Sequence, residues 1–126
     1  MKGMVFTDIP IPTLLEVYGV HLFPKLINVL PQFNNQDTDL LEFIESVENH
    51  IHVEVRKLYP DAELPTFEVV NSNSNELQFN YISKKNIPQL AKGLILGASK
   101  HFNKKLDVDF KHTEDGKILF TVKKVS

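Results

Sequence analysis

The segment from His52 to Phe67, HVEVRKLYPDAELPTF, contains the change of periodicity that decides the fold. Up to Tyr59 the apolar residues recur at helical spacing, and Pro60 ends this pattern because proline lacks an amide donor. From Thr66 onward apolar and polar residues alternate, as is typical of half-buried strands. The pattern predicts an α+β protein in which helices come first and pack on an antiparallel sheet.

Two main helices are expected before this boundary. The apolar residues of segment 13–30 predict a helix with a kink or break at Gly19 and Pro24. A second helix is expected from Asp39, which can cap it as Thr38 can, to about Tyr59. Its core stripe is predicted to consist of Ile44, Val47, Ile51, Val55 and Leu58, with His52 at the edge of the stripe.

Four strands and one crossing helix are expected after it. The strands are predicted at residues 66–70, 76–82, 105–112 and 118–125, and the helix opens at Asn86 and Pro88. Turns fall at NSNSN (71–75) and EDGK (114–117). Gly93 and Gly97 permit a close backbone approach. The helix residues expected to point inward are Leu90, Ala91, Leu94, Ile95, Ala98 and Phe102.

Length and composition favour one domain, residues 1–126, which is mainly helical over 1–60 and sheet plus helix over 61–126. The absence of cysteine excludes disulfides, thiolate ligands, iron–sulfur clusters and a cysteine nucleophile. A net charge of −2 without a basic stripe argues against nucleic-acid binding. No apolar run reaches the roughly 18 residues of a membrane span, and no secretory segment is recognised, so a cytoplasmic protein is expected.

His52 is the sharpest candidate for chemistry. A neutral imidazole on a helix is a good metal ligand, although a histidine at the edge of a stripe also suits a structural role. Glu48 lies four residues before it, a spacing that fits a surface charge ladder or two ligands of a non-haem metal. No nucleophile, paired base or metal cluster is visible, so the chain is not expected to be an enzyme.

A second candidate is Tyr81-x-Ser83-x-Lys85, at the end of a predicted strand. A phenol, a hydroxyl and an ammonium at every second residue share one face. Together they suit the binding of carboxylates. They equally suit a strand that ends in solvent, and the pattern alone leaves both interpretations open.

At these residues the chain resembles the haem-nitric oxide/oxygen binding (H-NOX, HNOB) family. The helix of His52, followed by Pro65 and Phe67, is similar to the family's proximal helix and the proline behind it. The motif Tyr81-x-Ser83-x-Lys85 resembles its Tyr-x-Ser-x-Arg propionate clamp. Segments 1–3, 14–26 and 93–98 are also similar to family segments. The chain resembles a shortened member, because the N-terminal distal helices of the family are missing between Phe6 and Leu14.

The resemblance implies a haem b cofactor, with His52 as the axial iron ligand. The residues that it assigns to haem binding are Tyr81, Ser83, Lys85, Pro65, Leu90 and Leu94. Lys85 replaces the clamp arginine, and lysine lacks the planar fork that grips a carboxylate at two points, so a weaker clamp is expected. Leu90 stands where oxygen-binding members carry a distal tyrosine, which favours nitric oxide or carbon monoxide.

Two functions follow from these features. The first is a nitric oxide sensor that binds the diatomic gas, releases the helix of His52 and signals to a partner such as a histidine kinase or nucleotide cyclase. The second is a haem-free H-NOX-like protein-interaction module, favoured by the missing distal helices and the weaker clamp. A homodimer is a further alternative, in which a second subunit covers the side left open by the missing distal helices.

Overall fold

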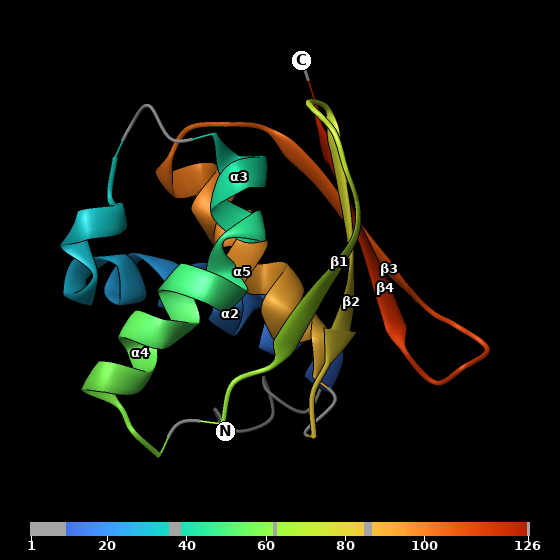
Figure 1. Cartoon of the computed structure of the whole chain (residues 1–126), viewed down its shortest axis with the longest axis horizontal. Coiled ribbons are helices and arrows are strands. Elements are labelled where there is room, and N and C mark those ends of the chain that lie inside the picture. Colours follow the sequence, from blue (N-terminus) through green and yellow to red (C-terminus); the bar gives the residue numbers. More distant parts are fainter. Residues whose placement is uncertain (1–9, 36–38, 62, 85–86, 126) are drawn as a thin grey trace, which may run out of the picture.

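The computed structural model describes residues 10–35, 39–61, 63–84 and 87–125. Predictions that fall on Met1–Phe6, Thr38, Lys85 and Asn86 lie outside these residues. The elements are α2 (Ile11–Val29), η1 (Pro31–Phe33), α3 (Leu40–Glu45), η2 (Val47–Ile51), α4 (His52–Leu58), β1 (Thr66–Ser72), β2 (Glu76–Ile82), α5 (Pro88–His101), β3 (Leu106–His112) and β4 (Ile118–Lys124). The helices lie on one side of the sheet (Figure 1), which confirms the predicted α+β class.

The sheet has the strand order β1-β2-β4-β3, and each neighbouring pair is antiparallel. Helix α5 connects β2 to β3 and is the crossing helix that the sequence predicts. The β3–β4 turn contains Gly116, whose φ of 83° suits glycine. Alternate residues of the two central strands are buried against the helices, as period-two patterning requires: Leu77, Phe79 and Tyr81 of β2, and Ile118, Phe120 and Val122 of β4.

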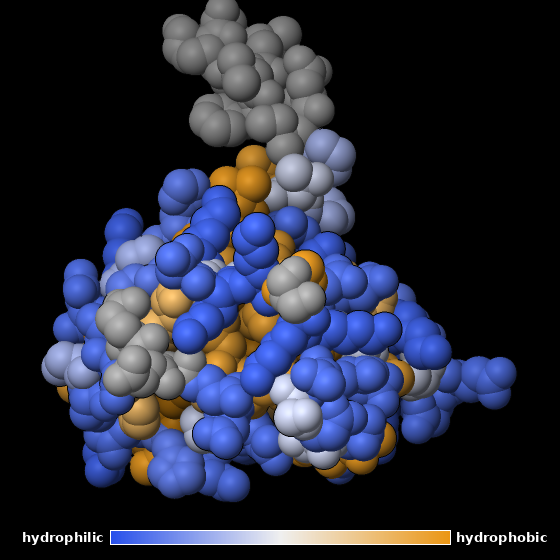
Figure 2. Space-filling model, turned by 90° about the horizontal axis from the view of Figure 1, so that it is seen from above, coloured by the Kyte–Doolittle hydropathy of each residue, from blue (hydrophilic) through white to orange (hydrophobic). Residues whose placement is uncertain are grey.

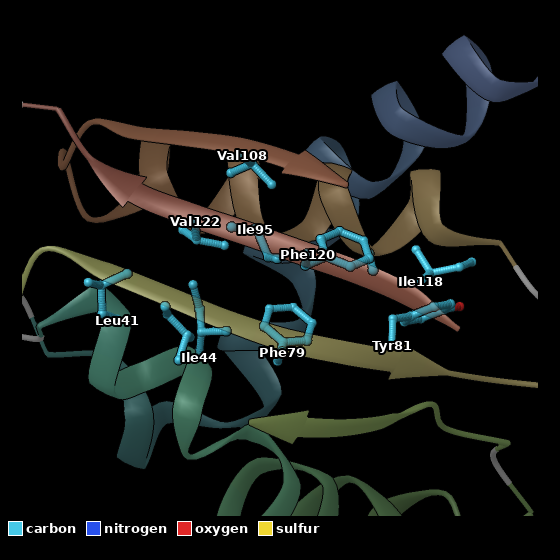
Figure 3. Close-up of a cluster of buried hydrophobic side chains, with 11 residues drawn as sticks. Leu41, Ile44, Phe79, Tyr81, Ile95, Val108, Ile118, Phe120 and Val122 are labelled. Atoms are coloured by element: carbon cyan, nitrogen blue, oxygen red, sulfur yellow. The ribbon is translucent and has the colours of Figure 1, made fainter. Parts of the chain in front are cut away.

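Aromatic rings form the centre of the core beneath α5. The Phe79 and Phe120 rings are stacked with their centroids 5.0 Å apart, and Phe67 stacks on the Phe79 ring at 4.5 Å. Figure 3 shows Phe79 and Phe120 on adjacent strands, near Ile95 of α5. Each fully buried ring contributes roughly 1.5–3 kcal/mol of transfer free energy, so this stack anchors the sheet to its helical layer.

Helices α2 and α5 pack backbone to backbone through Gly19, Gly93 and Gly97. A Cβ atom added to Gly93 would lie 2.1 Å from the carbonyl oxygen of Glu16, and one added to Gly19 would lie 2.6 Å from that of Leu90. Real Cβ atoms do not come so close to backbone, so these positions require glycine. The close approach predicted for Gly93 and Gly97 is confirmed.

Helix α2 runs without interruption through Pro24, so the predicted alternative of a break there is wrong. Proline removes the hydrogen bond that the carbonyl of Val20 would otherwise accept. Gly97 of α5 packs against this carbonyl, because a Cβ on Gly97 would lie 2.8 Å from its oxygen. The facing helix therefore covers the irregular turn, and the packing holds α2 together as one element.

The predicted helix from Asp39 to Tyr59 begins as expected but is divided by a π turn. The Asp39 carboxylate caps it by accepting hydrogen bonds from the amides of Leu41 (3.0 Å) and Glu42 (3.4 Å). In η2 the amide of His52 donates to the carbonyl of Val47, five residues earlier. The turn thus contains one residue more than an α-helix would place there.

The extra residue changes which side chains face the core. Leu58, which was predicted to be in the core stripe, is 51% exposed, and that prediction is wrong. His52, which was predicted to lie at the edge, is only 7% exposed. One inserted residue moves the side chains after it by about 100° around the helix axis, which brings His52 inward in place of the expected stripe.

Several large apolar side chains remain at the surface. Ile11 is 70% exposed and Tyr18 58% exposed, both on α2. In Figure 2 apolar atoms appear in the middle of the face and are surrounded by hydrophilic side chains. None of the described helices combines the length and the apolar character needed to cross a membrane.

Candidate functional site

His52 forms the centre of the candidate site. Its Nδ1 atom lies 3.2 Å from Oε1 of Glu48, four residues earlier on the same helical segment. An ionised carboxylate only accepts hydrogen bonds, so Nδ1 is the nitrogen that carries the proton. The lone pair of the neutral ring is then on Nε2.

The same oxygen of Glu48 joins His52 to the sheet. Oε1 also accepts a hydrogen bond from the backbone amide of Phe67, at 3.2 Å. The Phe67 ring meets the His52 imidazole edge to face, with centroids 5.7 Å apart, and lies 6.2 Å from the Tyr81 ring. The rings of His52 and Tyr81, both predicted site residues, therefore each lie near the ring of Phe67.

Burial sets the charge of His52. Removal of the ring from water lowers the pKa of His52 below its ordinary value of 6.5, and the nearby Arg56 lowers it further, whereas the hydrogen bond and charge of Glu48 oppose the shift. The imidazole is therefore neutral at pH 7. Neutral imidazole is the form that binds iron.

The Nε2 atom is available to a ligand. The hydrogen bond of His52 uses Nδ1, and among the described residues no enclosed side-chain nitrogen or oxygen lacks a partner. Nε2, which carries the lone pair, is therefore the nitrogen left for a ligand. A histidine that is held at one nitrogen by a carboxylate, with its lone pair on the other, fits the donor chemistry of a haem iron.

The other predicted residues are distributed over two parts of the fold. Tyr81 is 4% exposed, and its ring belongs to the core cluster of the sheet (Figure 3). Ser83 and Pro65 are half-buried. Leu90 and Leu94 are half-buried on α5, where Leu94 packs against the cluster of Phe23, Ile27, Leu40, Ala98 and Phe102. Lys85 lies outside the described residues.

Two hollows on the described surface are lined by residues other than the predicted site residues. One, of about 440 Å³, lies between α2 and α5 and includes Val20, His21 and Leu96. The other, of about 260 Å³, lies on the outer face of the sheet. The described residues contain no group of three or more carboxylates and histidines that could hold a metal ion, so the alternative of a non-haem metal at Glu48 and His52 gains no further ligand.

Sequence reasoning missed the parts played by Glu48 and Phe67. Glu48 was interpreted as part of a charge ladder or as a metal ligand, and Phe67 only as part of the motif after the helix. The spacing of four residues between Glu48 and His52 was the available signal. Only the fold shows that both meet Phe67.

Comparison with solved structures places the fold in a class. The structure is similar to the H-NOX protein from K. algicida in its Fe(II) unliganded state, with 36% identity, a TM-score of 0.87, and coverage of 97% of this chain and 67% of that one. The H-NOX from Shewanella woodyi in the Fe(II)CO state gives 30% identity, a TM-score of 0.76, and coverage of 94% and 64%. An H-NOX protein from S. oneidensis in the Fe(II)NO state shares the fold at 24% identity and a TM-score of 0.84, with coverage of 95% and 68%.

The fold is thus that of H-NOX proteins. Residues 4–110 match the family described as Haem-NO-binding, and the chain belongs to this family. It spans about two thirds of the length of the structures named above. No match was found among curated proteins.

Proposed function

We propose that this chain is a haem-binding sensor domain for nitric oxide, with His52 as the axial ligand. The observation that carries the proposal is the state of the imidazole, which is buried, neutral and held at Nδ1 by Glu48, so that its lone pair is on Nε2. Haem supplies an iron atom that binds a diatomic gas. The solved relatives support this assignment, since they are described as Fe(II), Fe(II)CO and Fe(II)NO proteins.

Further residues are assigned to the same group. Tyr81, Ser83 and Lys85 are proposed to bind the haem carboxylates, with a weaker hold at lysine than at arginine. Pro65, Leu90 and Leu94 are proposed to supply apolar contact. Leu90 offers no hydrogen-bond donor to bound dioxygen, which favours nitric oxide or carbon monoxide.

The output is proposed to pass through the segment that carries His52. Residues 47–58, here called the His52 segment, contain one buried side chain, that of His52 itself. A segment held by few contacts shifts at low cost, as a two-state sensor requires. The domain itself is proposed to have no catalytic activity and to signal to a separate cytoplasmic protein, such as a histidine kinase or nucleotide cyclase.

Titration with hemin tests the proposal, with the exposed His50 as a matched control on the same segment. The wild type and His50→Ala should show a Soret band that shifts on addition of nitric oxide. His52→Ala should lose this band or its shift. An unchanged spectrum in His52→Ala would contradict the assignment of the ligand.

A haem-free interaction module is the second candidate function. It is favoured by the shorter length of the chain, which covers 67% of its solved relative from K. algicida. A wild-type protein that folds but shows no Soret band with hemin would support this candidate. Size-exclusion chromatography would then show whether a second copy completes the domain.

A further inference from the structure

We propose that Glu48 is the positioning residue of the axial ligand: it orients the His52 imidazole, strengthens its donation to iron, and couples it to the sheet. This inference rests on the proposed haem function. It concerns a residue of this chain that neither the family match nor the clamp motif assigns.

The geometry supports this role in three ways. One carboxylate oxygen of Glu48 lies 3.2 Å from both Nδ1 of His52 and the amide nitrogen of Phe67. The two donors come from different layers of the fold, the His52 segment and strand β1. The Glu48 side chain is 29% exposed and that of His52 9%, so water competes only partly for these bonds.

The π turn explains why a side chain serves this purpose here. It turns His52 inward while Glu48 stays one turn earlier on the same side, so that the two residues face each other across η2. The amide of Phe67, in strand β1, donates a hydrogen bond to that carboxylate. Rotation of His52 about the helix axis would therefore break the bond to Glu48 or pull on β1.

A carboxylate partner also changes the chemistry of the ring. A charged acceptor at Nδ1 draws the proton toward itself, which makes Nε2 a stronger electron donor. Donation from a proximal ligand of this kind stabilises the oxidised iron and stiffens the iron–nitrogen bond. Glu48 is thereby expected to set how readily a gas ligand displaces His52.

The test compares Glu48→Gln and Glu48→Ala with Glu54→Gln. Glu54 is the matched control, because it lies on the same segment and pairs with Lys57 at 2.9 Å on the exposed side. In hemin-reconstituted protein, the iron–histidine stretching frequency should fall from wild type through Gln to Ala, and the reduction potential should rise. Haem affinity should drop roughly 10-fold or more in the Ala variant, as for other partners of metal-bound histidines. Glu54→Gln should match the wild type.

A second readout needs no haem. Nitrogen chemical shifts of His52 in the apo protein should show the proton on Nδ1 in the wild type, with a mixture of tautomers in Glu48→Ala. A proton on Nε2 in the wild type would overturn the proposal whether or not haem binds. If haem binds through His52 but the stretching frequency does not change in Glu48→Gln and Glu48→Ala, the role of Glu48 is wrong and the sensor function stands. Loss of the Soret band in the wild type would instead defeat the proposed function.

Discussion

Helix α5 and the His52 segment lie in the same helical layer but are held in different ways. Six residues of α5 are buried, three of them glycine or proline, and they contact both α2 and the sheet. In the His52 segment only His52 is buried, and the Glu48 bond and the Phe67 ring link the segment to the sheet. The difference indicates a closely packed scaffold that carries a loosely packed His52 segment, which is expected to move without unfolding the rest.

Substitution of Gly93, at the close contact between α2 and α5, should have the largest effect on stability. In Gly93→Ala the new Cβ would lie 2.1 Å from the carbonyl oxygen of Glu16, so α2 and α5 must separate. We expect the free energy of unfolding to fall by at least about 3 kcal/mol, the upper end for overpacked sites, as measured by urea denaturation.

Gly116→Ala is the matched control for this substitution. Gly116 has a positive φ of 83°, and no atom lies within 4 Å of a Cβ added there. Alanine at this position therefore introduces backbone strain but no steric clash. A loss of about 1 kcal/mol is expected there. Equal losses in the two variants would show that α5 is not closely packed on α2.

Much of the scaffold could be predicted from the sequence because its signals are local. Alternating residues predict the strands, Pro88 marks the start of α5, and Asp39 marks the start of the helix before the π turn. The π turn has no such signal. Whether an amide bonds to the carbonyl four or five residues earlier depends on what the segment packs against. For this reason Leu58 was wrongly placed in the core and His52 at its edge.

The candidate site divides along the same line. The identity of His52 and the spacing of Tyr81 and Ser83 could be recognised from sequence, and their assignment to haem stays a prediction. The link through Glu48 and Phe67 could not, because the two are 19 residues apart and meet only when the His52 segment packs against β1. The periodicity of the sequence predicts single elements and not the contacts between them.

Removal of the Phe67 ring should increase the difference in local stability between α5 and the His52 segment, because it loosens only the latter. Phe67 is half-buried and stacks on Phe79, so Phe67→Ala should cost about 2 kcal/mol, less than the ~3–5 kcal/mol of a fully buried phenylalanine. Hydrogen exchange should accelerate at residues 47–58 more than in α5. Val70→Ala, at an exposed position of the same strand, should leave both unchanged. Uniform acceleration would mean that the two regions open together.

The smallest effect concerns the start of the helix, where Asp39 ties it to the sheet through Lys124 at 3.2 Å. Burial opposes the shift, but the bonds from Lys124 and from the amides of Glu42 and Leu41 together lower the pKa of Asp39 below 3.8. The unfolded chain therefore takes up this proton first as the pH falls. The contribution of Asp39 is complete well above pH 3.8 and is lost as the pH drops through 3.8 toward the folded-state pKa.

At pH 7 Asp39→Ala should cost about 1 kcal/mol, as is usual for a lost helix cap. Asp39→Asn keeps a capping oxygen and should cost only a few tenths, because the ion pair with Lys124 is more than a third exposed. Urea unfolding of both variants at pH 7 and pH 3 measures these differences. The difference in the free energy of unfolding between wild type and Asp39→Asn should be smaller at pH 3 than at pH 7, since the asparagine carries no charge to lose. A gap that widens at low pH would mean that the Asp39 charge does not stabilise the folded state, and that the packing of Leu40, Leu41 and Ile44 alone attaches this helix to the scaffold.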